Sequence, residues 1–175
     1  MLLHRKGRIT LITLAVAAGI AVAIRTLYPL VGPPLLINYT DSEPKGLYWL
    51  EARPSAHYAR GELVAFAVPE PFQGLIYGRE WLAKGLPLMK GIGALEGDQV
   101  CIDDVHVSIN GAIVGPVFAA DSAGRALPKI RGCFKVGAGF FLPLSTLISR
   151  SFDGRYLGEE PLSEIRGKAN PLWIF

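Results

Sequence analysis

The chain has 175 residues, enough for one domain with a buried core and a short additional segment. Its net charge is +3, and its 18 basic residues are balanced by 15 acidic residues without a long basic run, so the composition argues against nucleic-acid binding. The 13 prolines and 20 glycines are scattered, a distribution that favours a turn-rich β fold over a disordered tail.

The N-terminal segment is typical of membrane anchors and export signals. Basic residues between His4 and Arg8 precede an uncharged apolar run, Ile9–Ile24, and this order predicts a cytoplasmic N-terminus. The run lies between the length of a signal-peptide core and the roughly 20 residues of a spanning helix. We favour a retained anchor, because Arg25 can extend its charge to the membrane interface. The cleavage-site-like Ala21–Ala23 leaves a removable signal open, and a buried core helix is a third interpretation.

Beyond this segment, short apolar runs bounded by turn residues predict β-strands. These runs are 35–37, 46–50, 63–68 and 134–142. Alternating residues over 105–114 surround Asn110-Gly111, the preferred two-residue hairpin turn. A short helix is expected over 77–83, ending near Gly85. We therefore predict a mostly β domain over residues 35–175, behind an anchor or signal segment over residues 1–34.

The two cysteines, Cys101 and Cys133, show no CxxC pattern and no spacing with histidine that suits a metal site. Beyond an export segment they would meet an oxidising compartment. There we expect one disulfide, worth about 3–4 kcal/mol on the chain-entropy model. Two unpaired, buried cysteines are the alternative.

Ser42 and Lys90 are the most informative side chains. Ser42 follows closely behind the apolar segment, where its hydroxyl would face a substrate emerging from a membrane. Lys90 ends the apolar run Leu86–Met89, and burial in such surroundings lowers the pKa of a lysine. A neutral lysine amine within hydrogen-bond reach of a serine can act as general base for acyl transfer without histidine. Taken singly, however, a serine before a proline usually makes a turn, and most lysines are solvated surface charges.

Other side chains are expected to have supporting or purely structural roles. Thr40 lies two residues before Ser42, on the same side of an extended strand, and could donate to an oxyanion beside the Ser42 amide. No GxSxG nucleophile elbow accompanies the histidines, which argues against a serine–histidine triad. Asp153 and Arg155 are expected to form a structural ion pair.

Several motifs, in the same order along the chain, resemble the signal peptidase I clan. They are the N-terminal anchor, the Ser42 segment, Gly61–Phe66, Lys90 with Gly97–Val100, the Asn-Gly hairpin and Ser151–Tyr156. More narrowly, the pattern over Asn38–Tyr48 and the sequence Arg131–Cys133 resemble the TraF-like conjugative-transfer branch. Glu43-Pro44 also favours that branch, because general signal peptidases usually carry methionine after the serine.

The resemblance implies a membrane-anchored serine endopeptidase with a mostly β signal-peptidase fold, using a Ser/Lys dyad without metal or cofactor. Its implied site residues are the nucleophile Ser42, the general base Lys90, the lysine-orienting Ser151, the oxyanion donor Thr40 and the bracing pair Asp153 and Arg155. The two cysteines, Cys101 and Cys133, also resemble those of the TraF-like branch.

The same resemblance implies a substrate and a location. The substrate would be a conjugative pilin precursor, processed by simple cleavage or by joining its ends into a ring. The enzyme would sit in the bacterial inner membrane, with its catalytic domain in the periplasm, as part of the conjugative transfer apparatus. Cleavage of the N-terminal segment would instead leave a periplasmic form.

Two alternatives stay open. One is a general signal peptidase I that removes signal peptides from secretory preproteins. The other is a non-enzymatic, anchored β domain that binds or assembles pilus components. A self-cleaving Ser/Lys repressor is disfavoured, because no DNA-binding module precedes Ser42 and the chain starts with an export signal.

Overall fold

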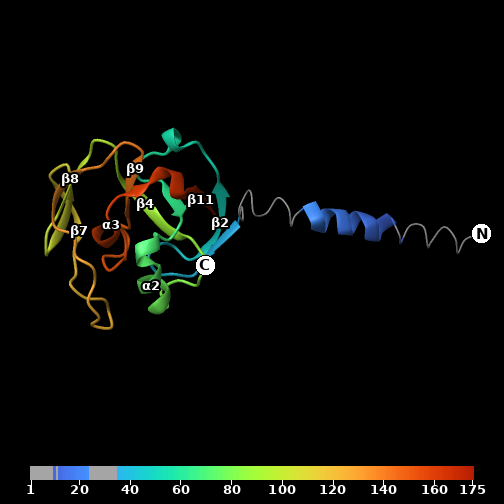
Figure 1. Cartoon of the computed structure of the whole chain (residues 1–175), viewed down its shortest axis with the longest axis horizontal. Coiled ribbons are helices and arrows are strands. Elements are labelled where there is room, and N and C mark those ends of the chain that lie inside the picture. The colour runs from blue at the N-terminus through green and yellow to red at the C-terminus, as the bar shows by residue number, and fades with distance from the viewer. Residues whose placement is uncertain (1–9, 11, 24–34) are drawn as a thin grey trace, which may run out of the picture. The chain divides into compact units, whose positions relative to one another are not determined.

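The computed structural model describes residues 10, 12–23 and 35–175 (Figure 1). The chain divides into two units, Met1–Pro34 and Leu35–Phe175, which are described separately. In the first unit residues 12–23 are helical. Across the described residues, no helix combines the length and apolar character that a membrane crossing requires. The predicted apolar span, Ile9–Ile24, lies partly outside the described residues.

The second unit is built on a seven-stranded antiparallel sheet. In spatial order its strands are β1 (Leu35–Asn38), β2 (Gly46–Glu51), β11 (Ile165–Ile174), β3 (Leu63–Phe66), β4 (Leu88–Leu95), β9 (Phe140–Leu144) and β10 (Glu160–Pro161). Strand β4, in the interior of the sheet between β3 and β9, carries Lys90, which lies opposite Val64 of β3 in the ladder. At the edge of the sheet β1 pairs with β2, and the loop that joins these two strands contains Ser42.

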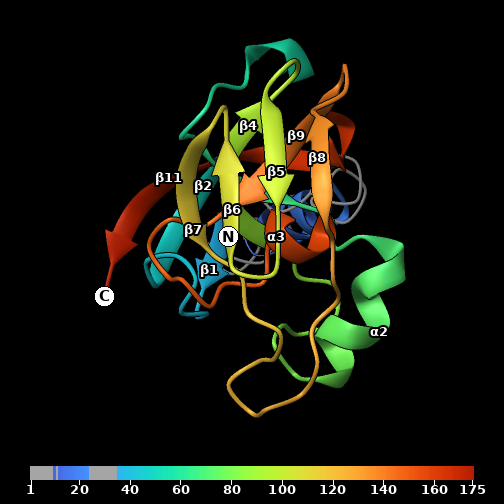
Figure 2. The ribbon, with the colours of Figure 1, turned by 90° about the vertical axis from the view of Figure 1, so that its left-hand side faces the viewer.

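A second sheet of four strands packs against one end of the first. Its strands are β7 (Ala112–Pro116), β6 (His106–Ile109), β5 (Gln99–Ile102) and β8 (Gly132–Lys135), and Figure 2 shows them lying over β4 and β9. Val100 and Val107 of this sheet share an apolar core with Leu142 and Leu144 of β9. Burying each such side chain stabilises the fold by about 1.5–3 kcal/mol, so the contact holds the two sheets as one body.

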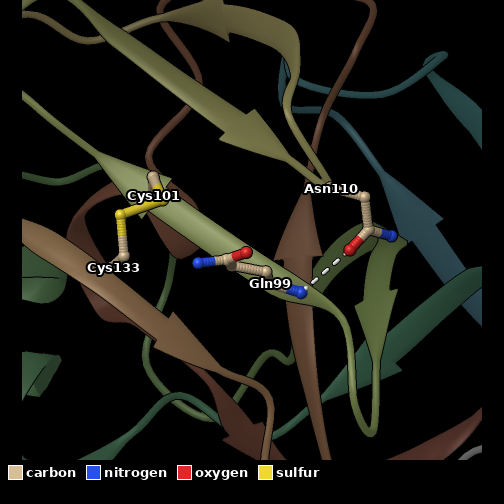
Figure 3. Close-up of a disulfide and its surroundings, with 4 residues drawn as sticks. All are labelled: Gln99, Cys101, Asn110 and Cys133. Atoms are coloured by element: carbon tan, nitrogen blue, oxygen red, sulfur yellow. Dashed lines mark hydrogen bonds between the residues drawn. A yellow bond between two sulfur atoms is a disulfide. The ribbon is translucent and has the colours of Figure 1, made fainter.

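The predicted disulfide is confirmed. Cys101 of β5 and Cys133 of β8 lie directly opposite each other and are joined, with their Cα atoms 4.0 Å apart (Figure 3). Near the other end of β5, the Gln99 backbone N–H donates to Asn110 Oδ1 at 2.9 Å, which ties the Asn-Gly turn to this strand (Figure 3).

A second core lies on the other side of the large sheet. Phe66 of β3 and Phe141 of β9 are fully buried and meet edge to face, with ring centroids 5.4 Å apart. Helix α2 (Glu70–Gly78) covers them through the buried Ile76. Three short helical segments, η1 (Ser55–His57), α3 (Gly154–Leu157) and η2 (Leu162–Glu164), complete the unit.

The mostly β fold class is confirmed, as are strands at the first three predicted runs. The predicted hairpin is also confirmed: β6 and β7 flank Asn110 and Gly111, whose φ angles are both positive, as this tight turn requires. The single strand predicted over 134–142 is wrong. It is divided between β8 and β9, in different sheets, and Gly139 at φ 79° lies in the turn between them.

The helix predicted over 77–83 is also misplaced. The observed helix α2 begins at Glu70 and ends at Gly78, with Pro71 in its first turn. Proline is tolerated at this position because the first turn of a helix has no N–H partner to lose, so Pro69 and Pro71 mark the start of α2. After Gly78 the chain turns, and Glu80 has a positive φ of 57°.

Candidate active site

The loop that carries Ser42 is ordered by one buried amide. Asn38, the last residue of β1, donates through Nδ2 to the carbonyl oxygens of Glu43 at 2.9 Å and Pro44 at 3.0 Å. Its Oδ1 accepts from the Thr40 backbone N–H at 3.1 Å. The side chain of Asn38, at the end of β1, therefore holds the loop over residues 39–45, and Ser42 is half-buried at its tip.

Lys90 meets Ser42 at this tip. Lys90 is 3% exposed, and its Nζ lies 2.5 Å from Ser42 Oγ. Burial lowers the pKa of Lys90 to about 8, against the opposing charges of Asp153 and Glu43, and the charge of Arg155 lowers it further. The structure thus brings together the two residues that the sequence singled out, 48 positions apart, with a lysine whose neutral form is accessible near neutral pH.

Asp153 and Arg155 form a buried ion pair behind Lys90. Both are at most 1% exposed, and Arg155 Nε and Nη2 donate to the two carboxylate oxygens of Asp153 at 2.8 Å each. Arg155 Nη1 also donates to the carbonyl oxygens of Ser149 at 2.5 Å and Pro116 at 3.0 Å. The pair must stay intact, because loss of one partner would leave an uncompensated buried charge. Through its hydrogen bonds it therefore holds the surrounding backbone in place.

Ser151 and Thr40 lie at the site, but neither hydroxyl makes the hydrogen bond that was expected of it. Ser151 is 3% exposed and its Oγ has no hydrogen-bond partner among the described residues, so the expected contact with Lys90 is not formed. Thr40 Oγ1 donates to Asn38 Oδ1 at 2.7 Å and lies 3.5 Å from Ser42 Oγ. A hydroxyl has one proton, so Thr40 must rotate away from Asn38 before it can donate to an oxyanion.

Sequence reasoning missed three residues of this site: Asn38, Glu43 and Ser145. Asn38 is the first residue of the Asn38–Tyr48 pattern that resembles the TraF-like branch, so the sequence contained a signal for its role. Glu43 is buried, and burial raises the pKa of its carboxyl group while Lys90 opposes that effect. Ser145 Oγ donates to the carbonyl oxygen of Ser42 at 2.6 Å across 103 residues of sequence, and no local pattern marks it.

A cavity of about 370 Å³ opens beside the Ser42–Lys90 pair. Its walls are mainly apolar and come from four separated parts of the chain, represented by Leu36, Trp81, Phe118 and Phe152. Ser151 lines the same cavity. Within the described ranges, no cluster of histidine, cysteine and carboxylate side chains is arranged to hold a metal ion. The arrangement can accommodate a short apolar peptide segment against a serine hydroxyl and an amine.

Comparisons with known proteins place this geometry in context. Residues 7–174 match the family model described as signal peptidase, peptidase S26. "Plasmid transfer protein TraF" of Escherichia coli is 31% identical over 168 residues, covering 90% of this chain and 92% of that protein. "Conjugal transfer protein TraF" of Agrobacterium fabrum is 35% identical over 170 residues, with the same two coverages. A solved signal peptidase I from Enterococcus faecalis is 20% identical over 67% of this chain and 97% of that chain, with a TM-score of 0.38, too low to carry an argument.

Proposed function

Because this chain belongs to the signal peptidase family S26, we propose that it is a serine endopeptidase in which Ser42 is the nucleophile and Lys90 the general base. The observation that carries the proposal is the 2.5 Å contact between Lys90 Nζ and Ser42 Oγ, made by a lysine that is 3% exposed. That distance allows direct proton transfer. Burial supplies the neutral amine that the transfer needs.

The reaction follows from these groups. The neutral Lys90 amine takes the Ser42 proton while Oγ bonds to the carbonyl carbon of the substrate, and the carbonyl oxygen becomes an oxyanion near the Ser42 amide and the Thr40 hydroxyl. As the C–N bond breaks, the Lys90 ammonium returns the proton to the leaving amine. The acyl group on Ser42 is then released by attack of water, which gives cleavage, or of another amine, which forms a new peptide bond.

We assign the substrate from the relatives. Two relatives are named as plasmid or conjugal transfer proteins, and each aligns with 90% of this chain. These names support a role in conjugal transfer, and the TraF-like resemblance of the sequence implies the substrate, a pilin precursor that is cleaved or closed into a ring. The proposed location is the bacterial inner membrane, with residues 35–175 in the periplasm. The Cys101–Cys133 disulfide supports an oxidising compartment.

The test uses the full chain in membranes, incubated with a pilin precursor and with ordinary secretory preproteins. Ser42→Ala and Lys90→Ala are expected to abolish precursor processing while the protein still accumulates. Ser163→Ala and Lys84→Ala, matched changes at exposed positions, are expected to leave processing intact. Mass spectrometry of the pilin product distinguishes a linear from a ring form. Processing by Ser42→Ala would overturn the enzyme proposal, and equal cleavage of secretory preproteins would favour a general signal peptidase.

A further inference from the structure

Ser145 contacts the nucleophile loop from a part of the chain far in sequence from Asn38. It follows β9 directly and is 4% exposed. Its Oγ donates to the carbonyl oxygen of Ser42 at 2.6 Å. Asn38 Nδ2 donates to the next carbonyl oxygen along the loop, that of Glu43, at 2.9 Å. The carbonyl oxygens of Ser42 and Glu43 are therefore held by two buried side chains, Ser145 after β9 and Asn38 at the end of β1.

Ser145 is itself fixed by the buried ion pair. Its backbone N–H donates to Asp153 Oδ2 at 2.9 Å, and its carbonyl oxygen accepts from Arg155 Nη2 at 3.4 Å. Asp153 is 0% exposed, so it cannot exchange this contact for water. A continuous chain of hydrogen bonds thus runs from Arg155 through Asp153 and Ser145 to the backbone of Ser42. In this chain Ser145 links the ion pair to the nucleophile loop, through the hydrogen bond from its hydroxyl to the Ser42 carbonyl oxygen.

The orientation of the Ser42 backbone affects the direction in which the nucleophile points. The Ser42 carbonyl oxygen belongs to the peptide group attached to the Cα that bears the nucleophile, so fixing it limits rotation of the whole residue. The direction of Oγ towards Lys90 depends on that rotation. A displacement of about 1 Å at a reacting group can lower the rate about 100-fold.

We propose that Ser145 is a positioning residue that couples the Asp153–Arg155 ion pair to the nucleophile by holding the Ser42 carbonyl oxygen. This inference rests on the proposed peptidase function. Ser145 touches neither the scissile bond nor the proton in transit; its hydroxyl acts through Ser42. Removing the hydroxyl should therefore slow acylation of Ser42 without weakening substrate binding.

The test compares wild type, Ser145→Ala, Ser145→Thr, Ser42→Ala and Ser163→Ala as full-length protein in detergent, with pilin precursor as substrate. The kcat and KM are measured per folded molecule, with the folded fraction taken from thermal unfolding. Ser145→Ala is expected to lower kcat about 10- to 100-fold with KM within about twofold of wild type. Ser145→Thr, which keeps the hydroxyl, is expected to recover most of kcat, and Ser163→Ala to match wild type.

Three results would overturn the inference. The first is a wild-type kcat for folded Ser145→Ala while Ser42→Ala is inactive. The second is a Ser145→Ala defect in KM alone, which would indicate a substrate contact. The third concerns Glu43, whose carboxyl group competes with the Ser42 carbonyl oxygen for the single proton of the Ser145 hydroxyl. If Glu43→Gln reproduces the full loss, the hydroxyl acts through Glu43 instead. Activity of Ser42→Ala would sink the proposed function itself, and so is distinguishable from all three.

Discussion

At the scale of single residues, the balance of charges around Lys90 decides when the site can work. Burial disfavours the ammonium, and Arg155 adds to that effect, while Asp153 and Glu43 favour it. Burial wins, which leaves the pKa near 8 rather than at the ordinary 10.5. A substantial share of the molecules therefore holds a neutral amine in mildly alkaline conditions, where a solvated lysine would remain protonated.

The first prediction is the pH dependence of the rate. Because the general base must be unprotonated, kcat/KM is expected to rise with pH and to level off above an apparent pKa of about 8. Initial rates on a peptide substrate between pH 5 and 10 measure this limb. The Lys84→Ala variant, changed at an exposed lysine, should give the same profile. A rate that stays flat from pH 6 to 9 would contradict Lys90 as the base.

The second prediction is that Lys90→Met stabilises the protein while it abolishes activity. Between about pH 8 and 10.5 the unfolded chain holds the Lys90 proton that the folded protein has released, so the stability of wild type rises with pH. Below about pH 8 both states are protonated, and the folded state bears the full cost of a buried ammonium. Since one pKa unit corresponds to about 1.4 kcal/mol, Lys90→Met should raise the free energy of unfolding at pH 7 by up to about 3 kcal/mol.

Urea unfolding at pH 7 and at pH 10.5 tests this linkage. The gain from Lys90→Met should shrink at the higher pH, where wild type no longer carries the buried charge. Lys84→Met is the matched control and should change stability by less than about 0.5 kcal/mol at both pH values. A destabilised Lys90→Met variant would mean that the hydrogen bond to Ser42 outweighs the cost of burial.

At the scale of elements, the segment 117–131 between β7 and β8 forms a wall of the site. Figure 2 shows it extending towards α2. Asp121 of this segment pairs with Arg79, which follows α2, at 3.0 Å and with Arg125 at 2.8 Å. Both arginines lie over the ring of Trp81, which lines the cavity together with Phe118 of the same segment. The charge cluster thus attaches the wall to the end of α2, in addition to the contacts of Val117 and Ile130 with the core between the sheets.

The third prediction follows from this attachment. Asp121→Ala removes the carboxylate that both arginines share, so the wall should loosen and KM for a peptide that fills the cavity should rise about 3- to 10-fold. The kcat should stay near wild type, because Ser42 and Lys90 lie on other elements. Glu96→Ala, which removes an exposed carboxylate outside this segment, is the control and should change neither constant. A fall in kcat with constant KM would show that the segment acts on the chemistry.

Local patterns predicted the elements whose signals are local. The Asn-Gly turn specified the hairpin of β6 and β7, and apolar runs between turn residues located β1, β2 and β3. Helix α2 was misplaced because its prolines are compatible with either a strand end or a first helical turn. Ser42 and Lys90 were recognisable from their neighbours in sequence, whereas Ser145 acquires its contact only when β9 is brought to the nucleophile loop. Contacts of that kind depend on tertiary packing, which no sequence period encodes.

At the scale of the whole molecule, the described contacts of the site lie within residues 35–175. The nucleophile loop joins β1 and β2, Lys90 lies on β4, and Ser145 follows β9. The Asp153–Arg155 pair is hydrogen-bonded to the backbone of Ser145. The two sheets share a core through Val100, Leu142 and their neighbours, and the disulfide joins two strands of the smaller sheet. We therefore expect this unit to contain the chemistry and the N-terminal segment to supply the proposed membrane location.

The fourth prediction tests that division with a fragment of residues 35–175, exported to the periplasm behind a cleavable signal. We expect the fragment to unfold in one cooperative transition and to cleave a soluble peptide with the kcat/KM of the full chain. Its rate on a membrane-embedded precursor should fall at least about tenfold, because tethering to the same membrane raises the effective concentration of enzyme and substrate. The fragment carrying Ser42→Ala is the control and should be inactive on both substrates. An inactive but folded wild-type fragment would show that the first 34 residues take part in forming the site.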